Sequence, residues 1–245
     1  MSAQVDTSTL PKLNPKSKHL KRIVAVGFNE TDLAGVVSDR GVAVKVPILF
    51  KPDDTENVLN AILGRPIPSR RPSTTRKPTT TKPTNEIRCL FVGDLYNFGS
   101  DDYSVHQVGF AVLYAEDADG IQRGKKKEPK QVLKCLFVGD LYNFGKNVEK
   151  YVDEAELISS VGYDFLDLED ANAAAGLWAY GYTTFSAFPD LSNFTSIYSK
   201  FLEKLEKMQF TDTASPVPTS NAIEAVNNIP VDDIRANCIV FFSAQ

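Results

Sequence analysis

Eleven residues of this chain occur twice without a single difference: residues 89–99 and residues 135–145 both read CLFVGDLYNFG. A match of this length indicates a copied segment. Each copy begins with an apolar run followed directly by Gly-Asp, which is typical of a buried strand that ends in a turn. A sheet has one place for a given central strand, so only one of the two copies can occupy it.

The composition is that of an ordinary globular protein. The chain has 245 residues, a hydrophobic content of 42% and a formal net charge of −4, which suits one sizeable α/β domain or two small ones. This charge does not indicate a nucleic-acid partner, and no apolar run approaches the roughly 18 residues of a membrane span. The polar N-terminal stretch lacks the apolar core of a signal peptide, so we expect no secretory leader there.

Composition divides the chain into four segments. Residues 1–64 alternate strand and helix patterns. Residues 65–86 combine prolines, threonines and scattered basic residues, and we expect an extended, solvated linker. Residues 87–133 contain the first repeat copy and an insert that we expect to be poorly ordered. Residues 134–245 have the most regular pattern of strands and helices.

Alternating strands and helices predict the fold class. Besides the second repeat copy, apolar runs predict strands over 22–28, 41–47, 176–183 and 238–242. Helical spacing of apolar residues predicts helices over 29–37, 53–63, 147–165, 193–208 and 219–228. This order favours a doubly wound α/β fold, with a mostly parallel sheet flanked by helices. Such sheets bind ligands at the carboxyl ends of central strands, which directs attention to the Gly-Asp of the repeat.

Three segments resemble a known family. CLFVGDLYNFG, LWAYGYT and NCIVFFSAQ are similar to segments of the von Willebrand factor A domain, above all the nematode versions that accompany C-type lectin domains. Residues 134–245 resemble the first half of that Rossmann-like domain, and residues 21–63 resemble its second half. The halves therefore stand in reversed order in this chain.

The two ends of the chain fit this reversal. Ser-Ala-Gln occurs at residues 2–4 and again at residues 243–245, so joining the ends would give a continuous fourth strand, connection and fifth strand. The chain is then a circular permutant or a window across a tandem array of such domains. We expect the halves to dock into one sheet. In the alternative, each half is an unfinished domain with an unpaired strand edge.

The resemblance also implies a metal-ion-dependent adhesion site, which in the family reads Asp-x-Ser-x-Ser plus a threonine and an aspartate from later loops. Here Asp140 keeps the first position, but Tyr142 and Phe144 replace the serines, and Ala244 stands near the late aspartate. Thr219 is the one candidate for the threonine. One carboxylate and one hydroxyl rarely hold Mg²⁺ or Ca²⁺. We therefore expect a degenerate site without a cofactor, in which Asp140 accepts hydrogen bonds from loop amides.

The residue types and spacings of this chain do not favour an enzyme. The Gly-Asp-Leu of the repeat resembles the Gly-Asp motif of metallophosphoesterases, whose sites cluster several histidines. This chain has two, His19 and His106, and neither has a partner at ligand spacing. No phosphate-binding glycine loop is present, and Cys135 and Cys238 lie in apolar runs where thiols are typically inert. We expect no enzyme, with a metal-dependent hydrolase as the less favoured alternative.

The remaining interpretation is an adhesion module that binds a protein or glycoprotein ligand, as the resemblance implies. The alternative is a rearranged duplicate without a selected function. Two N-glycosylation sequons, at Asn29 and Asn193, together with the Thr/Pro-rich linker favour an extracellular setting. The lack of a signal peptide argues against secretion, because a cytoplasmic product would also lack one.

The resemblance places Cys135 and Cys238 on adjacent central strands. A disulfide between adjacent parallel strands is geometrically awkward, so we expect two buried free thiols rather than a bridge. The second repeat copy runs directly into its own helix, and loop closure therefore favours it for the central position. Cys89, in the displaced first copy, should then react quickly with a thiol reagent, and Cys135 slowly.

Overall fold

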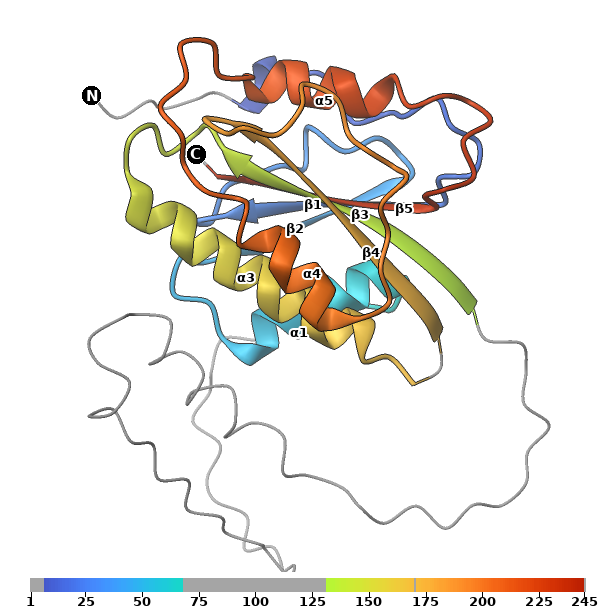
Figure 1. Ribbon diagram of the computed structural model, residues 1–245. Coiled ribbons are helices and arrows are strands. Elements are labelled where there is room, and N and C mark those ends of the chain that lie inside the picture. Colours follow the sequence, from blue (N-terminus) through green and yellow to red (C-terminus); the bar gives the residue numbers. More distant parts are fainter. Residues whose placement is uncertain (1–6, 68–130, 170, 245) are drawn as a thin grey trace, which may run out of the picture. The chain divides into compact units, whose positions relative to one another are not determined.

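A computed structural model describes residues 7–67, 131–169 and 171–244, and these residues belong to one compact unit (Figure 1). Most of the expected linker lies outside the described residues. The first repeat copy, with Cys89, and residues 100–130 of the expected insert also lie outside them, whereas residues 131–133 begin a strand.

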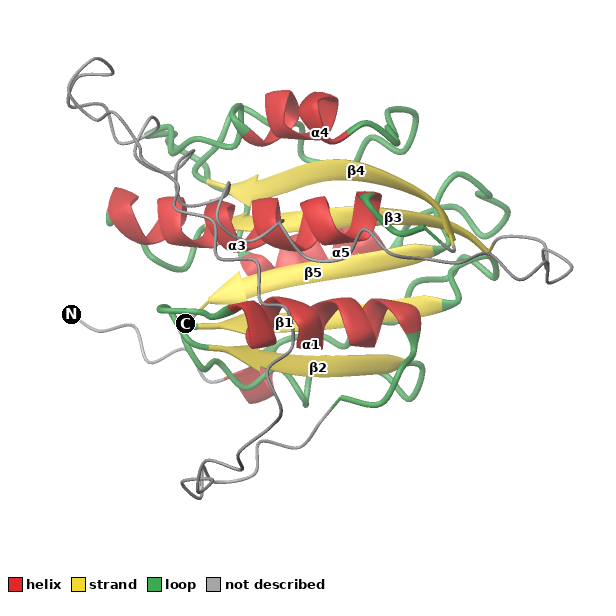
Figure 2. Cartoon of the chain, turned by 90° about the horizontal axis from the view of Figure 1, so that it is seen from below, coloured by secondary structure: helices red, strands yellow, loops and turns green. Residues whose placement is uncertain are grey.

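Five parallel strands form a single sheet, which confirms the predicted α/β class. Its order is β2-β1-β5-β3-β4, and all strands point toward the same edge (Figure 2). The strands are β1 (Arg22–Phe28), β2 (Gly41–Val46), β3 (Gln131–Leu141), β4 (Ala171–Gly181) and β5 (Cys238–Ala244).

Helices cover both faces of the sheet (Figure 1). On one face lie α1 (Pro52–Leu63), α3 (Val148–Leu166) and α4 (Tyr198–Leu205), and on the other lies α5 (Thr219–Asn227). A short 3₁₀ turn, η1 (Thr7–Thr9), precedes them in the chain. Within the described part of the chain, none of the helices has the length and apolar character needed to cross a membrane.

Strands from the two ends of the chain meet in the middle of this sheet. β1 pairs with β5 along its full length, from Arg22 opposite Cys238 to Phe28 opposite Ala244. Docking of the two segments therefore joins strands separated by about two hundred residues of sequence into one hydrogen-bonded ladder. β1 also pairs with β2 on its other side, and β5 also pairs with β3, so both strands lie inside the sheet.

The second repeat copy forms an inner strand of the sheet, as predicted. β3 lies between β5 and β4 and is buried from Cys135 to Leu141. The strand begins at Gln131, upstream of the repeat, and its last four repeat residues form the turn that follows. The helix that directly follows this copy, α3, packs back onto β3.

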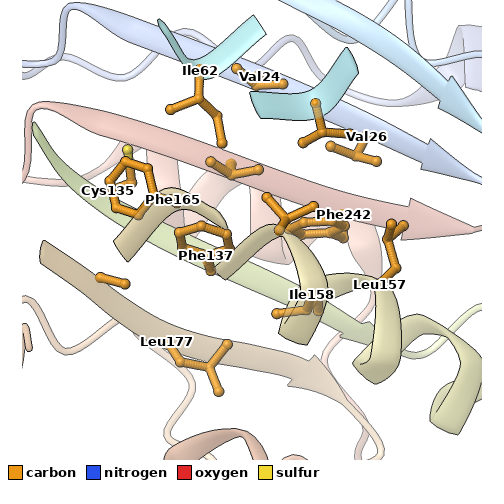
Figure 3. Close-up of a cluster of buried hydrophobic side chains, with 14 of the residues drawn as sticks. Val24, Val26, Ile62, Cys135, Phe137, Leu157, Ile158, Phe165, Leu177 and Phe242 are labelled. Carbon is orange, nitrogen blue, oxygen red and sulfur yellow. The ribbon is translucent and has the colours of Figure 1, made fainter. Parts of the chain in front are cut away.

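The larger apolar core lies between the sheet and α1, α3 and α4 (Figure 3). At its centre Phe137 of β3 contacts three other rings, Phe165, Phe201 and Phe242, with ring centroids 5.8, 5.4 and 6.2 Å apart. Because these rings come from β3, β5 and two helices, the core ties together elements from the whole C-terminal half of the chain.

The second core lies on the opposite face, under α5 and an N-terminal strap, which we define as residues 10–21. Leu13 and Leu20 of the strap are buried in this core, at 0% and 3% exposure. The backbone N–H of Asn14 donates to Asn227 Oδ1 of α5 at 2.7 Å. The polar composition of this segment predicted no structure, so its role as a cover for the sheet was missed.

The expectation of two free thiols is wrong, because Cys135 and Cys238 form a disulfide. They are direct register partners on β3 and β5, and their Cα atoms lie 4.3 Å apart. This pair opens the β3–β5 ladder, where the two strands approach closely enough to be bridged. Side chains at opposed positions of parallel strands also point to the same face, which brings the two sulfurs together.

Two helix predictions need correction. Residues 29–37 form turns instead of a helix, because Asn29 and Glu30 take left-handed φ values of 54° and 60° and Thr31 Oγ1 donates to the Phe28 carbonyl at 2.6 Å. The helix expected over 193–208 is limited to α4. Its predicted first turn is extended instead, since Thr195 forms two backbone hydrogen bonds with Ala175 at the outer edge of β4.

The disulfide should stabilise the fold strongly. Its two cysteines are 103 residues apart, and closing so long a loop restricts the unfolded chain. In a Cys89→Ala background, the Cys238→Ala substitution should lower the free energy of unfolding by about 2–5 kcal/mol, measured by urea denaturation. Reductant should have the same effect on the Cys89→Ala protein alone, and an unchanged midpoint with reductant would contradict the bridge.

Removing the buried anchor of the strap should also be costly. Leu13 is fully buried, so Leu13→Ala should lower the free energy of unfolding by about 2–5 kcal/mol. Leu49→Ala is the matched control, because the Leu49 side chain is 83% exposed and should change stability little. Equal effects of the two substitutions would show that the strap does not cover the core.

Candidate functional site

The central strands separate at their carboxyl ends, and a polar group of side chains fills the gap. β3 and β5 are paired only from Cys135–Cys238 to Val138–Phe241, although both strands continue beyond that point. This is also where the direction of the chain crossings reverses, since β4 lies on one side of β3 and β5 on the other. Doubly wound sheets place their binding sites at such a switch point.

Asp140 is the centre of this group. Its carboxylate is fully buried, and Oδ1 accepts the backbone N–H groups of Tyr142 and Asn143 at 2.7 and 3.1 Å. Its Oδ2 accepts the Ser243 hydroxyl at 3.2 Å and the Ala244 backbone N–H at 3.1 Å. Burial raises the pKa of Asp140, while the hydrogen bonds from Tyr142 and Ala244 oppose that rise. The prediction that Asp140 accepts hydrogen bonds from loop amides is thus confirmed.

The side-chain amide of Asn143 lies among the oxygens that the resemblance assigns to a metal. Its Nδ2 donates to Asp140 Oδ2, and it also lies 3.0 Å from Thr219 Oγ1 and 3.1 Å from Ser243 Oγ. An amide nitrogen carries two hydrogens, so three oxygens share two donors. A neutral donor of the protein itself therefore occupies the point where these oxygens converge.

Glu154 of α3 lies directly beneath Asp140 and is also fully buried. Its Oε1 accepts the backbone N–H of Asp140 at 2.7 Å, and its Oε2 has no partner among the described residues. Burial first, and then the nearby Asp140 charge, raise the pKa of Glu154 well above its usual range. Asp140 has several donors and Glu154 has one, so Glu154 is the carboxyl of this pair whose pKa is raised more.

Aromatic rings border the polar group. Tyr142 stacks on Tyr182 at 6.1 Å between ring centroids, and Tyr182 contacts Phe210 at 5.3 Å. Phe210 in turn stacks on Tyr151, which meets Phe144 edge-on. We call this continuous set of Tyr142, Phe144, Tyr151, Tyr182 and Phe210 the aromatic row. It follows the carboxyl ends of β3 and β4 and the start of α3.

The structure brings together both residues that the sequence predicted for a metal site. Asp140 and Thr219 both contact the Asn143 amide, although Asn143 and Thr219 are 76 residues apart in the sequence. Ala244, at the predicted place of the late aspartate, contributes a backbone donor instead. Among the described residues, no three or more His, Cys, Asp or Glu side chains form a group suited to a metal ion.

Sequence reasoning missed Asn143, Glu154 and Ser243. Two signals point to the first two of them: Asn143 follows Asp140 at the spacing of an Asx-type turn, and Glu154 stands on the helix face that carries the buried Tyr151, Leu157 and Ile158. A carboxyl in an otherwise buried stripe indicates a buried polar contact.

The two predicted sequons are placed differently. Asn193 is exposed in the loop before α4, whereas Asn29 is partly buried in the turn after β1. Glycosylation at either residue stays a prediction.

Glu154 should make the stability of the protein pH-dependent. Its pKa is raised in the folded state, so its proton stabilises the fold fully below the unfolded pKa of about 4.3. That contribution is lost as the pH rises toward the folded pKa. Glu154→Gln should therefore unfold at a higher temperature than the wild type at about pH 7, and the difference should shrink toward about pH 4.

The control for this prediction is Glu203→Gln, on the exposed side of α4. It should leave the pH profile of the melting temperature unchanged. The neighbours that act on the Glu154 carboxyl are Asp140, Tyr151 and Tyr180, and the phenols stay neutral throughout this range because their own pKa values are raised. A parallel pH profile for the wild type and Glu154→Gln would contradict a proton on Glu154.

Comparisons of the chain with protein-family models, with curated proteins and with solved structures found no match. The resemblance to the von Willebrand factor A domain accordingly stays a hypothesis. It rests on the repeated motif and on the order of the predicted strands.

Proposed function

We propose that this chain is a non-enzymatic recognition module of the von Willebrand factor A type, which binds a protein or glycoprotein ligand without a metal ion. The observation that carries the proposal is the position of the Asn143 amide. It donates to Asp140 and lies within 3.1 Å of the Thr219 and Ser243 hydroxyls, all at the switch point of the sheet.

An internal amide changes what this edge of the sheet can do. Here the converging oxygens already have a hydrogen-bond donor, and a divalent ion would have to displace the Asn143 side chain. Two carboxyls, one of them with a pKa raised well above its usual range, also provide too little negative charge for tight binding of Mg²⁺ or Ca²⁺. The polar group is therefore better suited to holding the carboxyl ends of the strands rigid than to binding an ion.

Ligand contact would then come from the aromatic row beside this edge. Tyr142, Phe144, Tyr182 and Phe210 are half-buried, so none of the four residues is fully enclosed by the protein. Aromatic side chains provide a large contact area at a small cost in conformational entropy, and they are enriched in binding sites for proteins. The bonds of Asp140 to the Tyr142 and Asn143 N–H groups hold the turn that carries two of these rings.

The setting that suits such a module is extracellular. The Cys135–Cys238 disulfide supports an oxidising compartment, since disulfides are rare in reducing ones. The sequons at Asn29 and Asn193 and the Thr/Pro-rich linker point the same way. The alternative of a rearranged duplicate without a selected function is less favoured, because strands from both segments complete one sheet with cores on both faces.

The proposal can be tested by binding of the whole chain to a panel of purified extracellular-matrix glycoproteins. Binding should persist in EDTA, because the Asn143 amide already occupies the point where the oxygens of Asp140, Thr219 and Ser243 converge. A Tyr142→Ala/Tyr182→Ala variant should bind at least about tenfold more weakly, as expected for the loss of two central aromatic contacts.

Ile234→Ala is the matched control, because Ile234 is 69% exposed in the loop that precedes β5, at the opposite edge of the sheet. It should bind like the wild type. Loss of binding in EDTA would overturn the metal-free mode, and absence of any ligand in the panel would favour the rearranged duplicate. Hydrolysis of a phosphodiester on addition of Mn²⁺ would support the hydrolase alternative instead.

A further inference from the structure

The N-terminal strap carries a concentration of positive charge that the proposed function does not use. Four lysines lie within ten residues, at Lys12, Lys16, Lys18 and Lys21, and no acidic residue occurs between Asp6 and Glu30. The chain as a whole is acidic, with a net charge of −4. The strap is therefore a positively charged segment in a chain whose net charge is negative.

The fold sorts the strap into a buried side and an exposed side. Leu13, Pro15, Ser17 and Leu20 are buried against the sheet and α5. The four lysines are all exposed. The buried side of the strap thus packs against the sheet, and the lysines point to solvent. The strap lies on the face of the sheet opposite α1, α3 and α4 (Figure 1).

Backbone hydrogen bonds hold the strap in place along its length. The N–H of Leu13 donates to the Val36 carbonyl at 2.7 Å, that of Lys18 to Val231 at 3.2 Å, and that of Lys21 to Asn237 at 2.9 Å. The lysine stems therefore start from fixed points, which lowers the entropy lost when a ligand binds several of them at once.

Arg40 adds a fifth cation to the same surface. Its Nη2 donates to Asn14 Oδ1 at 3.0 Å and to the Pro15 carbonyl at 3.1 Å, so its guanidinium lies against the strap between Lys12 and Lys16. We call Lys12, Lys16, Lys18, Lys21 and Arg40 the cationic ridge. The backbone from Lys12 to Lys21 can span at most about 32 Å. The ridge can therefore contact only a short stretch of a linear ligand.

Few acidic groups neutralise the ridge. Lys18 pairs with Asp232 at 2.8 Å, but both side chains are largely exposed, at 65% and 82%, and such pairs contribute little. Asp233, which lies near His19 of the strap, is paired with Arg235. Lys12 and Lys21 have no acidic partner within the part of the chain that the structure describes.

We propose that the cationic ridge binds a linear sulfated polysaccharide. A row of fixed lysines suits a polyanion with regularly spaced charges, and it gains affinity by releasing the counterions of that polyanion. The strap has no Phe, Tyr or Trp on which a base could stack and no exposed apolar side chain that could enter a membrane. The disulfide in the core favours an oxidising compartment, where sulfated polysaccharides are abundant and nucleic acids are scarce.

The test measures binding of the full chain to heparin by calorimetry at several salt concentrations. The ridge variant is Lys12→Gln/Lys16→Gln/Lys21→Gln. The matched control is Lys51→Gln/Lys200→Gln/Lys207→Gln, which removes the same charge from exposed lysines that are not on the strap. The ridge variant should bind at least about tenfold more weakly, and its log Kd should depend less steeply on log salt, by about 3 in slope. The control should bind like the wild type.

Two further measurements locate the bound heparin on the chain. Heparin should protect Lys12, Lys16 and Lys21 of the wild type from acetylation, a readout that does not depend on any variant folding. The basic run at 123–130 lies outside the described residues, so Lys125→Gln/Lys126→Gln/Lys127→Gln is measured as well. Loss of binding in that variant, but not in the ridge variant, would overturn the proposal. Equal affinity for desulfated heparin, or tighter binding of duplex DNA, would overturn the ligand class.

Discussion

The pairing of β3 with β5 is the interaction on which the rest of the structure depends. β5 is the only strand that connects the β1–β2 pair to the β3–β4 pair in the described sheet, so the β3–β5 ladder joins the two parts of the sheet. The disulfide between Cys135 and Cys238 stands at the start of the ladder and fixes its register. Both apolar cores then follow, because side chains of β3 and β5 contribute to each of them.

The same two strands create the candidate site by separating. Beyond Val138 and Phe241 the ladder ends, and the Asp140 N–H turns to the Glu154 carboxyl. The buried carboxylate needs donors, and the protein provides them from its own backbone, from Ser243 and from the Asn143 amide. Because the protein provides all of these hydrogen-bond donors itself, we favour recognition of a ligand through the neighbouring surface, where the aromatic row lies.

Much of the fold could be predicted because its strands are long apolar runs. The failures have two causes, which are locally left-handed backbone and contacts between segments far apart in sequence. The turns over 29–37 have the apolar spacing of a helix, but left-handed residues after β1 prevent it. Thr195 bonds to the edge of β4 instead of starting α4. The strap has little hydrophobic signal of its own and becomes ordered only against α5 and the sheet.

The residues alone were enough to predict the α/β class, the second repeat copy as an inner strand of the sheet, and Asp140 with Thr219 as members of one polar group. These depend on local apolar patterns and on a motif that can be read along the chain. Packing between distant segments set the disulfide, the Asn143 amide among the oxygens, the raised pKa of Glu154 and the separation of lysines from the buried side of the strap. Each of these depends on distances between residues that sequence order leaves free, and packing sets them.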